Sequence, residues 1–234
     1  MKICALIQTR FNSTRLPGKA LMDLNGMPVI QHIYRRLLGC RMVDSVAYAT
    51  GISGDEDSAL PHWEKARLEG HHFFLSPESD LVGRMLYGGR MLGGSAILRI
   101  TGDCWAHDPR LLDDMIRFFL DGYPHIQGVC NWNPRTYSEG VDAEIYTMEL
   151  LNKLDKDPNC PREGFATYAV AHGMLAKWPP PLSWDAYKDT LAYRDLHTSI
   201  DTQADLDLAR KVLAKIGNDE WNYWKTMEAY YEVR

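Results

Sequence analysis

Three cations lie within ten residues near the start of the chain, directly after an apolar segment. Residues 1–9 (MKICALIQT) are mostly apolar, and residues 10–19 then read RFNSTRLPGK. This second stretch carries Arg10, Arg15 and Lys19 among residue types that favour turns. Cations, hydroxyls and free backbone N–H groups together suit the oxygens of a triphosphate. A solvated basic loop would have the same composition, and neither a Walker A motif nor a G-x-G-x-x-G motif is present.

A second chemical signal is a carboxylate that directly follows an apolar strand. Residues 96–101 (AILRIT) predict a buried strand, Gly102 can bend the chain, and Asp103 comes next. Asp201 follows a predicted strand over residues 196–200 in the same way. Two carboxylates at one edge of a sheet can share Mg²⁺, which binds carboxylates, phosphate oxygens and water. Each carboxylate could instead shape the start of the following turn or helix.

Two further pairs of charged residues are candidates for binding. In residues 135–144 (RTYSEGVDAE), Asp142 and Glu144 lie on the same side of a predicted strand. They could bind hydroxyl groups of a substrate or accept a proton, or they could simply face solvent. Asp80 and Arg84 are four residues apart on a predicted helix, a spacing that also fits a surface ion pair.

Strands and helices alternate over the first 120 residues. The apolar pattern predicts strands at residues 1–9, 46–50, 72–75 and 96–101, and helices at 28–39, up to Glu69, at 81–92 and from Asp108 through Phe119. Such alternation is typical of right-handed βαβ units and of a mostly parallel sheet covered on both faces. The fold class is therefore predicted to be α/β.

The pattern changes after residue 123. It predicts strands near 125–130, 141–146 and 196–200, and helices at 147–156, 162–172, 203–216 and 219–233. Thr202 and Asp205 match a capping box at the start of the third of these helices. In the last helix, Trp221, Trp224, Met227 and Tyr231 are predicted to form a buried stripe. We expect one domain over residues 1–234, with a small inserted arm at about 132–190.

Composition limits the classes of protein that need to be considered. The chain has 234 residues and 45% hydrophobic content, enough for a substantial core. A net charge of −5 and a pI near 5.9 argue against general nucleic-acid binding. The five cysteines include no C-x-x-C pair, and no apolar run approaches the ~20 residues of a membrane span. We expect a cytoplasmic protein with free, buried thiols and no nucleic-acid or membrane partner.

Residues 7–19 (IQTRFNSTRLPGK) resemble the signature loop of the cytidylyltransferases that make CMP-activated sugars. The resemblance is to the branch of the spore-coat polysaccharide and acylneuraminate enzymes. It continues in motif order through residues 76–84, 98–104, 135–144 and 199–208. The chain departs from the family pattern at Thr9, Asn12, Trp105 and Gly164, where relatives usually have Ala, Gly, Pro and His.

This resemblance implies a Rossmann-like nucleotidyltransferase fold and a reaction. CMP would pass from CTP to an unidentified sugar-acid, phosphate or phosphonate acceptor, with release of pyrophosphate, in surface-glycan synthesis. It also implies Mg²⁺ as cofactor and, by analogy, a homodimer. The implied catalytic residues are Arg15, Lys19 and Asp103. The implied nucleotide contacts are Gln8, Arg10, Asn12, Ser13, Thr14, Asp80, Arg84 and Thr101. The implied acceptor contacts are Arg135, Tyr137, Asp142 and Glu144, and the implied metal ligands are Asp103 and Asp201.

Other functions remain open at this point. A glycosyltransferase on a related nucleotide-binding sheet would normally carry an Asp-x-Asp metal motif, and residues 103–105 (DCW) do not form one. A nucleotidyltransferase with a different base preference fits the same residues. A non-catalytic nucleotide-binding or scaffold protein is the third alternative, indicated by the departures at Asn12, Trp105 and Gly164.

Overall fold

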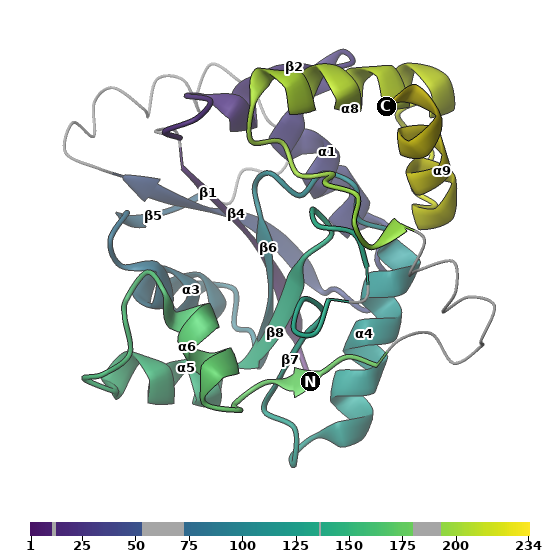
Figure 1. Cartoon of the computed structure of the whole chain (residues 1–234). Coiled ribbons are helices and arrows are strands. Elements are labelled where there is room, and N and C mark those ends of the chain that lie inside the picture. The colour runs from purple at the N-terminus through teal and green to yellow at the C-terminus, as the bar shows by residue number, and fades with distance from the viewer. Residues whose placement is uncertain (11–12, 53–72, 136, 180–192) are drawn as a thin grey trace.

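A seven-stranded sheet forms the centre of the computed structural model, which describes residues 1–10, 13–52, 73–135, 137–179 and 193–234 (Figure 1). The strand order is β5-β4-β1-β6-β8-β7-β9. The first four of these strands are parallel, whereas β8 runs antiparallel to both β6 and β7. The bounds are β1 Ile3–Arg10, β4 Ser45–Ile52, β5 Phe73–Pro77, β6 Ala96–Thr101, β7 Gly128–Cys130, β8 Ala143–Thr147 and β9 Ala176–Lys177. The predicted α/β fold with a mainly parallel sheet is confirmed.

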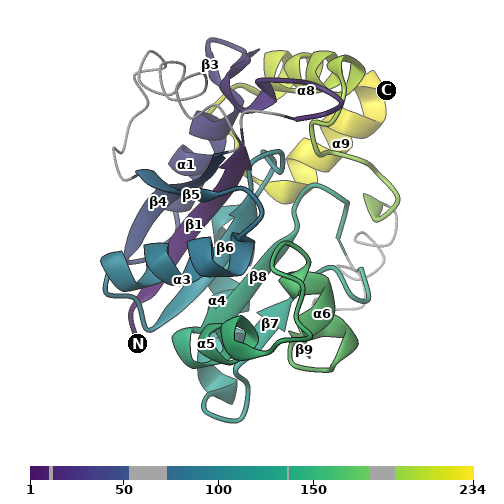
Figure 2. The ribbon, with the colours of Figure 1, turned by 90° about the vertical axis from the view of Figure 1, so that its left-hand side faces the viewer.

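Helices cover both faces of the sheet, and each face has its own apolar core (Figure 2). Side chains alternate between the two faces along β1, so Ala5 belongs to one core and Leu6 to the other. The first core includes residues of α1 (Val29–Leu38), α4 (Pro109–Gly122), α8 (Gln203–Ile216) and α9 (Tyr223–Val233). The second includes residues of α3 (Leu81–Met91), α5 (Met148–Lys156) and α6 (Phe165–Ala171). The short elements are η1 Lys19–Leu21, β2 Asp23–Leu24 and β3 Met27–Pro28.

One predicted strand is wrong. Residues 196–200 form only an isolated bridge, between His197 and Glu139. The backbone N–H of Ile200 donates to the carbonyl of Asp103 (3.0 Å), so the segment turns toward the end of β6 instead of continuing along a neighbouring strand. This turn brings the following residue, Asp201, to the sheet edge.

The predicted buried stripe of the last helix is also wrong in part. Met227 is buried, but Tyr231 is 72% exposed. The helix begins at Tyr223 because the Asn222 side chain accepts from the Lys225 N–H and caps it there. The helix face turned to the core therefore carries Tyr223, Thr226, Met227 and Tyr230, while Trp221 and Trp224 are half-buried.

Several other expectations can be compared with the structure. All five cysteines are free and buried, as predicted. Asn12 and the predicted helix up to Glu69 lie outside the described residues. Within the predicted arm, β8 and β9 join the main sheet, and α5 and α6 cover one of its faces. Among the described residues, no helix combines the length and apolar character needed to cross a bilayer.

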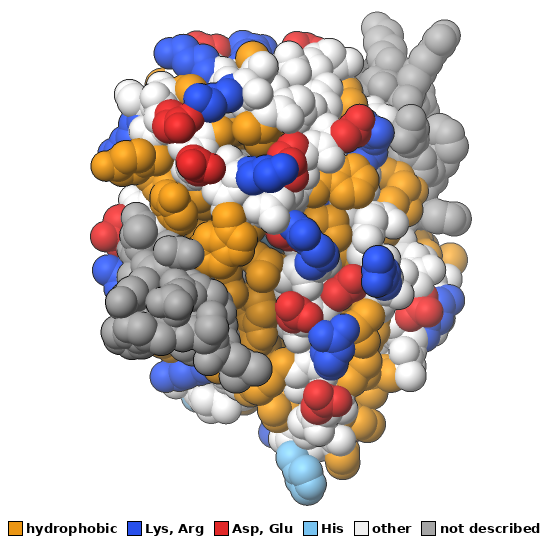
Figure 3. All heavy atoms as spheres, turned by 90° about the vertical axis from the view of Figure 1, so that its right-hand side faces the viewer, with side chains coloured by type: hydrophobic (Ala, Val, Ile, Leu, Met, Phe, Trp, Pro, Cys, Tyr) orange, Lys and Arg blue, Asp and Glu red, His pale blue; other side chains and the backbone are white. Residues whose placement is uncertain are grey.

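The surface on the right of Figure 1 mixes charge with apolar side chains. Figure 3 shows basic and acidic side chains interspersed over the described part of this face, next to apolar side chains.

Candidate functional site

The loops that follow β1 and β6 meet at one edge of the sheet, because these two strands are parallel neighbours. The Gly102 N–H donates to the Gln8 carbonyl (2.7 Å), and a Cβ on Gly102 would lie only 2.9 Å from that oxygen. A side chain at residue 102 would therefore separate the two strand ends. Gly18, with φ of 72°, begins the short helix that carries Lys19. Both glycines bring Lys19 toward the end of β6.

Lys19 is the centre of the site. Its Nζ donates to Asp103 Oδ2 (2.8 Å), to Asp201 Oδ1 (2.9 Å) and to the carbonyl of Ile200 (2.7 Å). Burial alone would lower the pKa of Lys19, but the two carboxylates raise it above its ordinary value. Burial likewise acts to raise the pKa of Asp103, but Lys19 outweighs it and the pKa is lowered. The ion pair is therefore fully charged at neutral pH.

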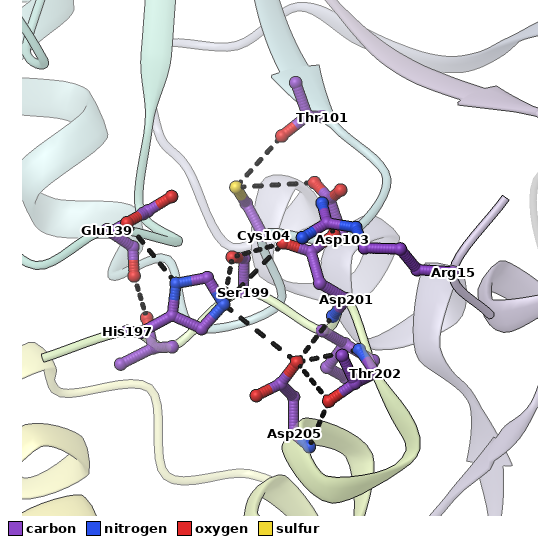
Figure 4. Close-up of polar contacts among 12 residues, drawn as sticks. Arg15, Thr101, Asp103, Cys104, Glu139, His197, Ser199, Asp201, Thr202 and Asp205 are labelled. Atoms are coloured by element: carbon purple, nitrogen blue, oxygen red, sulfur yellow. Dashed lines mark hydrogen bonds and ion pairs between the residues drawn. The ribbon is translucent and has the colours of Figure 1, made fainter. Parts of the chain in front are cut away.

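Asp201 is held by the start of α8. Thr202 and Asp205 form the predicted capping box, and the Asp201 N–H also donates to Asp205 Oδ2 (3.1 Å). Arg15 reaches the same carboxylate from the loop after β1, with Nη2 at 2.8 Å from Asp201 Oδ1. Figure 4 shows Arg15 directed at Asp201 from outside the cluster. Arg15 is 65% exposed at its side chain, so a ligand can reach it.

A pocket of about 330 Å³ opens beside this cluster. The two cations and two carboxylates just described balance in formal charge, so a triphosphate there would need further positive charge. Most of the predicted nucleotide contacts line the pocket together with the ion-pair cluster. The lining residues are Gln8, Thr9, Arg10, Ser13, Thr14, Arg15, Lys19, Ala20, Glu78, Leu81, Arg84, Thr101, Gly102, Asp103, Glu163 and Asp201.

The donor set around Lys19 fits a hard divalent cation. Two carboxylates and one backbone carbonyl converge on a single position, and all three are oxygen donors of the kind that Mg²⁺ prefers. Within the described residues, no group of three or more His, Cys, Asp or Glu side chains forms a larger metal site. In this structure the Lys19 ammonium occupies the position on which the three oxygens converge, and it supplies the positive charge between Asp103 and Asp201.

Two predicted nucleotide contacts act mainly within the protein. Arg84 is 2% exposed, and its guanidinium donates to the carbonyls of Thr9 (3.4 Å), Pro77 (3.3 Å) and Glu78 (3.0 Å). It thereby ties the end of β1 to the segment after β5, at the wall of the pocket. Arg10 pairs with Glu78 at 2.5 Å, and both residues line the pocket.

Asp80 does not pair with Arg84, although their spacing allowed it. Its carboxylate caps α3 by accepting from the Gly83 N–H (3.1 Å) and accepts from Arg162 Nε (2.8 Å). It is not among the residues that line the pocket. In this structure Asp80 therefore stabilises the start of α3 and links it to Arg162.

The predicted acceptor contacts lie in different environments. Arg135 and Asp142 form a bidentate ion pair that is partly exposed on both sides. The pKa of Asp142 is raised because burial outweighs the effect of Arg135. Tyr137 is 3% exposed and stacks on Trp178 (5.2 Å between ring centroids), so its ring is part of the core. Glu144 is 4% exposed and pairs with a buried arginine.

Reasoning from the sequence missed several polar residues near the site. Glu78 and Glu163 line the pocket, although neither was predicted as a site residue and Glu78 belongs to the family-like segment 76–84. His197 lies between Glu139 and the carboxylates of Asp201 and Asp205 (Figure 4). No local motif indicates the contact between His197 and Glu139, because it joins two segments that are far apart in the chain. Arg99 did carry a signal, since it is a charged residue inside an otherwise apolar strand.

Comparison with known proteins agrees with this arrangement. A family model described as cytidylyltransferase matches residues 4–157. The 3-deoxy-manno-octulosonate cytidylyltransferase of Geobacter sulfurreducens is 33% identical over 191 residues, which is 81% of this chain and 67% of that protein. A solved cytidylyltransferase from Leptospira borgpetersenii serovar Hardjo-bovis superposes with a TM-score of 0.84 at 26% identity, covering 99% of this chain and 94% of that one. A CMP:2-keto-3-deoxy-manno-octonic acid synthetase solved with CTP has a TM-score of 0.64 at 17% identity, covering 92% and 100%, and shares the fold.

Proposed function

The chain belongs to the cytidylyltransferase family, and from this premise we propose that it transfers CMP from CTP to a sugar-acid acceptor and releases pyrophosphate. The observation that carries the proposal is the cluster of Lys19, Arg15, Asp103 and Asp201 at the mouth of a pocket large enough for a nucleotide. The relatives whose names specify a substrate support a sugar acid as acceptor.

In the proposed reaction, an oxygen of the acceptor attacks the α-phosphorus of CTP. A new P–O bond forms to the acceptor, the bond to the β-phosphate oxygen breaks, and the pyrophosphate leaves with its electron pair. Lys19 and Arg15 would stabilise the charge that develops on the leaving group. Arg10, which also lines the pocket, would hold the triphosphate after exchanging its contact with Glu78 for phosphate oxygens.

Asp103 and Asp201 are the residues that would hold Mg²⁺. The bound ion would supply positive charge to the phosphate oxygens, which the balanced formal charges of the cluster do not provide. Lys19 would remain protonated on leaving the carboxylates, because the phosphate oxygens that replace them would favour the charged form just as Asp103 and Asp201 do in this structure. It could then turn to the triphosphate.

The acceptor would lie beyond Asp103, toward residues 135–142. Arg135 offers two N–H groups to an acidic group of the acceptor, provided that its pairing with Asp142 is exchanged. The raised pKa of Asp142 makes its carboxylate a stronger proton acceptor than an ordinary aspartate, so it could accept the proton of the attacking acceptor group. The family resemblance of residues 7–19 supports surface-glycan synthesis in the cytoplasm as the setting, and the homodimer stays a prediction.

The first experiment measures nucleotide binding, because it requires no acceptor. Thermal unfolding would be recorded with CTP, UTP, ATP and GTP, each with and without Mg²⁺, for the wild type and Asp103→Ala. We expect stabilisation by CTP that increases with Mg²⁺, and loss of that increase in the variant. Pyrophosphate release with a panel of sugar acids would follow. Equal stabilisation by all four nucleotides would contradict the assignment of cytosine, and no stabilisation by any would contradict the function.

A further inference from the structure

A row of polar side chains crosses the sheet next to the pocket. Its members are Trp132, Glu144, Arg99 and Gln8, which come from the segment after β7 and from β8, β6 and β1, four neighbouring positions in the sheet. Trp132 Nε1 donates to Glu144 Oε1 (2.6 Å), Arg99 Nη1 donates to Glu144 Oε2, and Arg99 Nε donates to Gln8 Oε1 (2.6 Å). The row thus connects a half-exposed indole to a residue of the pocket wall.

Arg99 is the buried charge of this row. The residue is 9% exposed, and its guanidinium lies 5.8 Å from the ring centroid of Phe165. Burial alone would lower its pKa, but the Glu144 carboxylate raises it. A buried ion pair of this kind contributes little net stability compared with apolar side chains of similar volume. Its presence in the middle of the sheet therefore suggests a purpose other than stability.

Arg99 determines how the Gln8 amide is oriented. A guanidinium carries only N–H donors, so the atom of Gln8 that faces Arg99 must be the carbonyl oxygen. The amide nitrogen of Gln8 consequently points away from Arg99. Gln8 lines the pocket, and no hydrogen bond joins its Nε2 to another of the described residues. The two N–H donors of Gln8, a residue of the pocket wall, are thus held in a fixed direction by Arg99.

We propose that Arg99 is a positioning residue that fixes the Gln8 amide as a donor to the nucleotide. The group it would bind is a hydrogen-bond acceptor of CTP, such as a carbonyl, a ring nitrogen or a phosphate oxygen, and to this extent the inference rests on the proposed function. Glu144 serves the same purpose, because both of its oxygens already accept from Arg99 and Trp132. In this proposal Glu144 therefore acts through Arg99.

The test is a double-mutant cycle on CTP affinity, measured by calorimetry with Mg²⁺ and without acceptor. Gln8→Met removes the donor. Arg99→Met with Glu144→Met replaces the ion pair by two apolar side chains of similar length and leaves no unpaired charge. We expect each variant to bind CTP about tenfold more weakly, the loss of one directed hydrogen bond, and the combined variant to lose no more. Arg36→Met is the control, since Arg36 is also a buried arginine but donates to the carbonyls of His107 and Glu220.

The outcomes separate this inference from the function itself. Additive losses, or full affinity in the variant without the ion pair, would overturn the positioning role. An equal loss of affinity in Arg36→Met would do the same, because it would show that any buried arginine matters. A wild type that binds no nucleotide would overturn both proposals. If the variant without the ion pair does not fold, Gln8→Glu decides the matter. Its second oxygen would repel an acceptor atom, so it should bind CTP more weakly than Gln8→Met, and equal affinities would contradict the proposal.

Discussion

Lys19 is the side chain on which both carboxylates of the site depend. Its ammonium contacts both Asp103 and Asp201, and no other cation among the residues that the structure describes contacts both. We predict that Lys19→Met lowers kcat/KM for pyrophosphate release by about 10²–10³-fold, the loss typical of a group that stabilises a developing negative charge. Steady-state kinetics with CTP and an active acceptor would measure this.

An exposed lysine provides the control. Lys211→Met changes an exposed residue of α8, the helix that follows Asp201, and should keep full activity. If Lys19→Met stays within a few-fold of the wild type, Lys19 is not a catalytic residue. If both variants lose activity equally, the effect comes from net charge and not from the position of Lys19.

The same ion pair predicts a pH dependence of stability. The pKa of Asp103 is lowered from 3.8, so its stabilising contribution is present above pH 3.8 and is lost as the pH falls through the folded value. The pKa of Lys19 is raised from 10.5, so its contribution is present below pH 10.5 and is lost as the pH rises through the folded value. The wild type should therefore exceed Lys19→Met by about 1 kcal/mol in free energy of unfolding at neutral pH. Urea unfolding between pH 3 and pH 10 would measure the difference in free energy of unfolding between the wild type and Lys19→Met. A difference that increases in acid would contradict the ion pair between Lys19 and Asp103 as its cause.

At the level of elements, the segment 196–201 is placed by one glycine. Gly140 has φ of 103°, and a Cβ there would lie 2.3 Å from the backbone nitrogen of Ser199. We predict that Gly140→Ala pushes this segment from its place, moves Asp201 away from Lys19, and lowers both activity and the free energy of unfolding, the latter by about 2 kcal/mol or more. Urea unfolding and pyrophosphate release would be measured on the same sample.

Gly173→Ala is the control that separates backbone strain at a positive φ from the steric clash with Ser199. Gly173 also has a positive φ, 64°, but a Cβ there would meet nothing within 4 Å. It should show the backbone strain alone, about 1 kcal/mol, with unchanged activity. Equal effects of the two substitutions would mean that the contact with Ser199 carries no consequence for the site.

The elements themselves show how far the sequence could be used for prediction. β1 and β6 were predictable because each is an apolar run that ends at a turn-forming residue, and the parallel rule then places both loops at one edge. The segment 196–200 has the same local pattern, yet its backbone pairs with two loop residues, Glu139 and Asp103, and not with a neighbouring strand. Arg99 and Glu144 are 45 residues apart, and alternation along a strand gives the face of each side chain but not its partner. Contacts between distant segments were therefore missed.

At the scale of the whole molecule, the C-terminal helix supports a site formed largely by the first half of the chain. Tyr230 of α9 is 2% exposed, and its hydroxyl accepts from Trp105 Nε1 (3.0 Å) and donates to the carbonyl of Thr198 (3.3 Å). Trp105 is two residues after Asp103, and Thr198 is three residues before Asp201. One hydroxyl group thus contacts both of the segments that carry the carboxylates.

Removal of this hydroxyl should therefore affect both stability and the site. Tyr230→Phe leaves the buried Trp105 N–H without its acceptor, because Trp105 is completely buried and water cannot replace the hydroxyl. We predict a loss of about 2 kcal/mol in free energy of unfolding, together with weaker stabilisation by Mg²⁺ and CTP. Tyr231→Phe, the adjacent and exposed tyrosine, should change neither quantity. Unfolding in urea with and without Mg²⁺ and CTP would measure both quantities. If Tyr230→Phe loses stability but keeps the full effect of Mg²⁺ and CTP, α9 supports the fold alone and the two carboxylates are positioned without it.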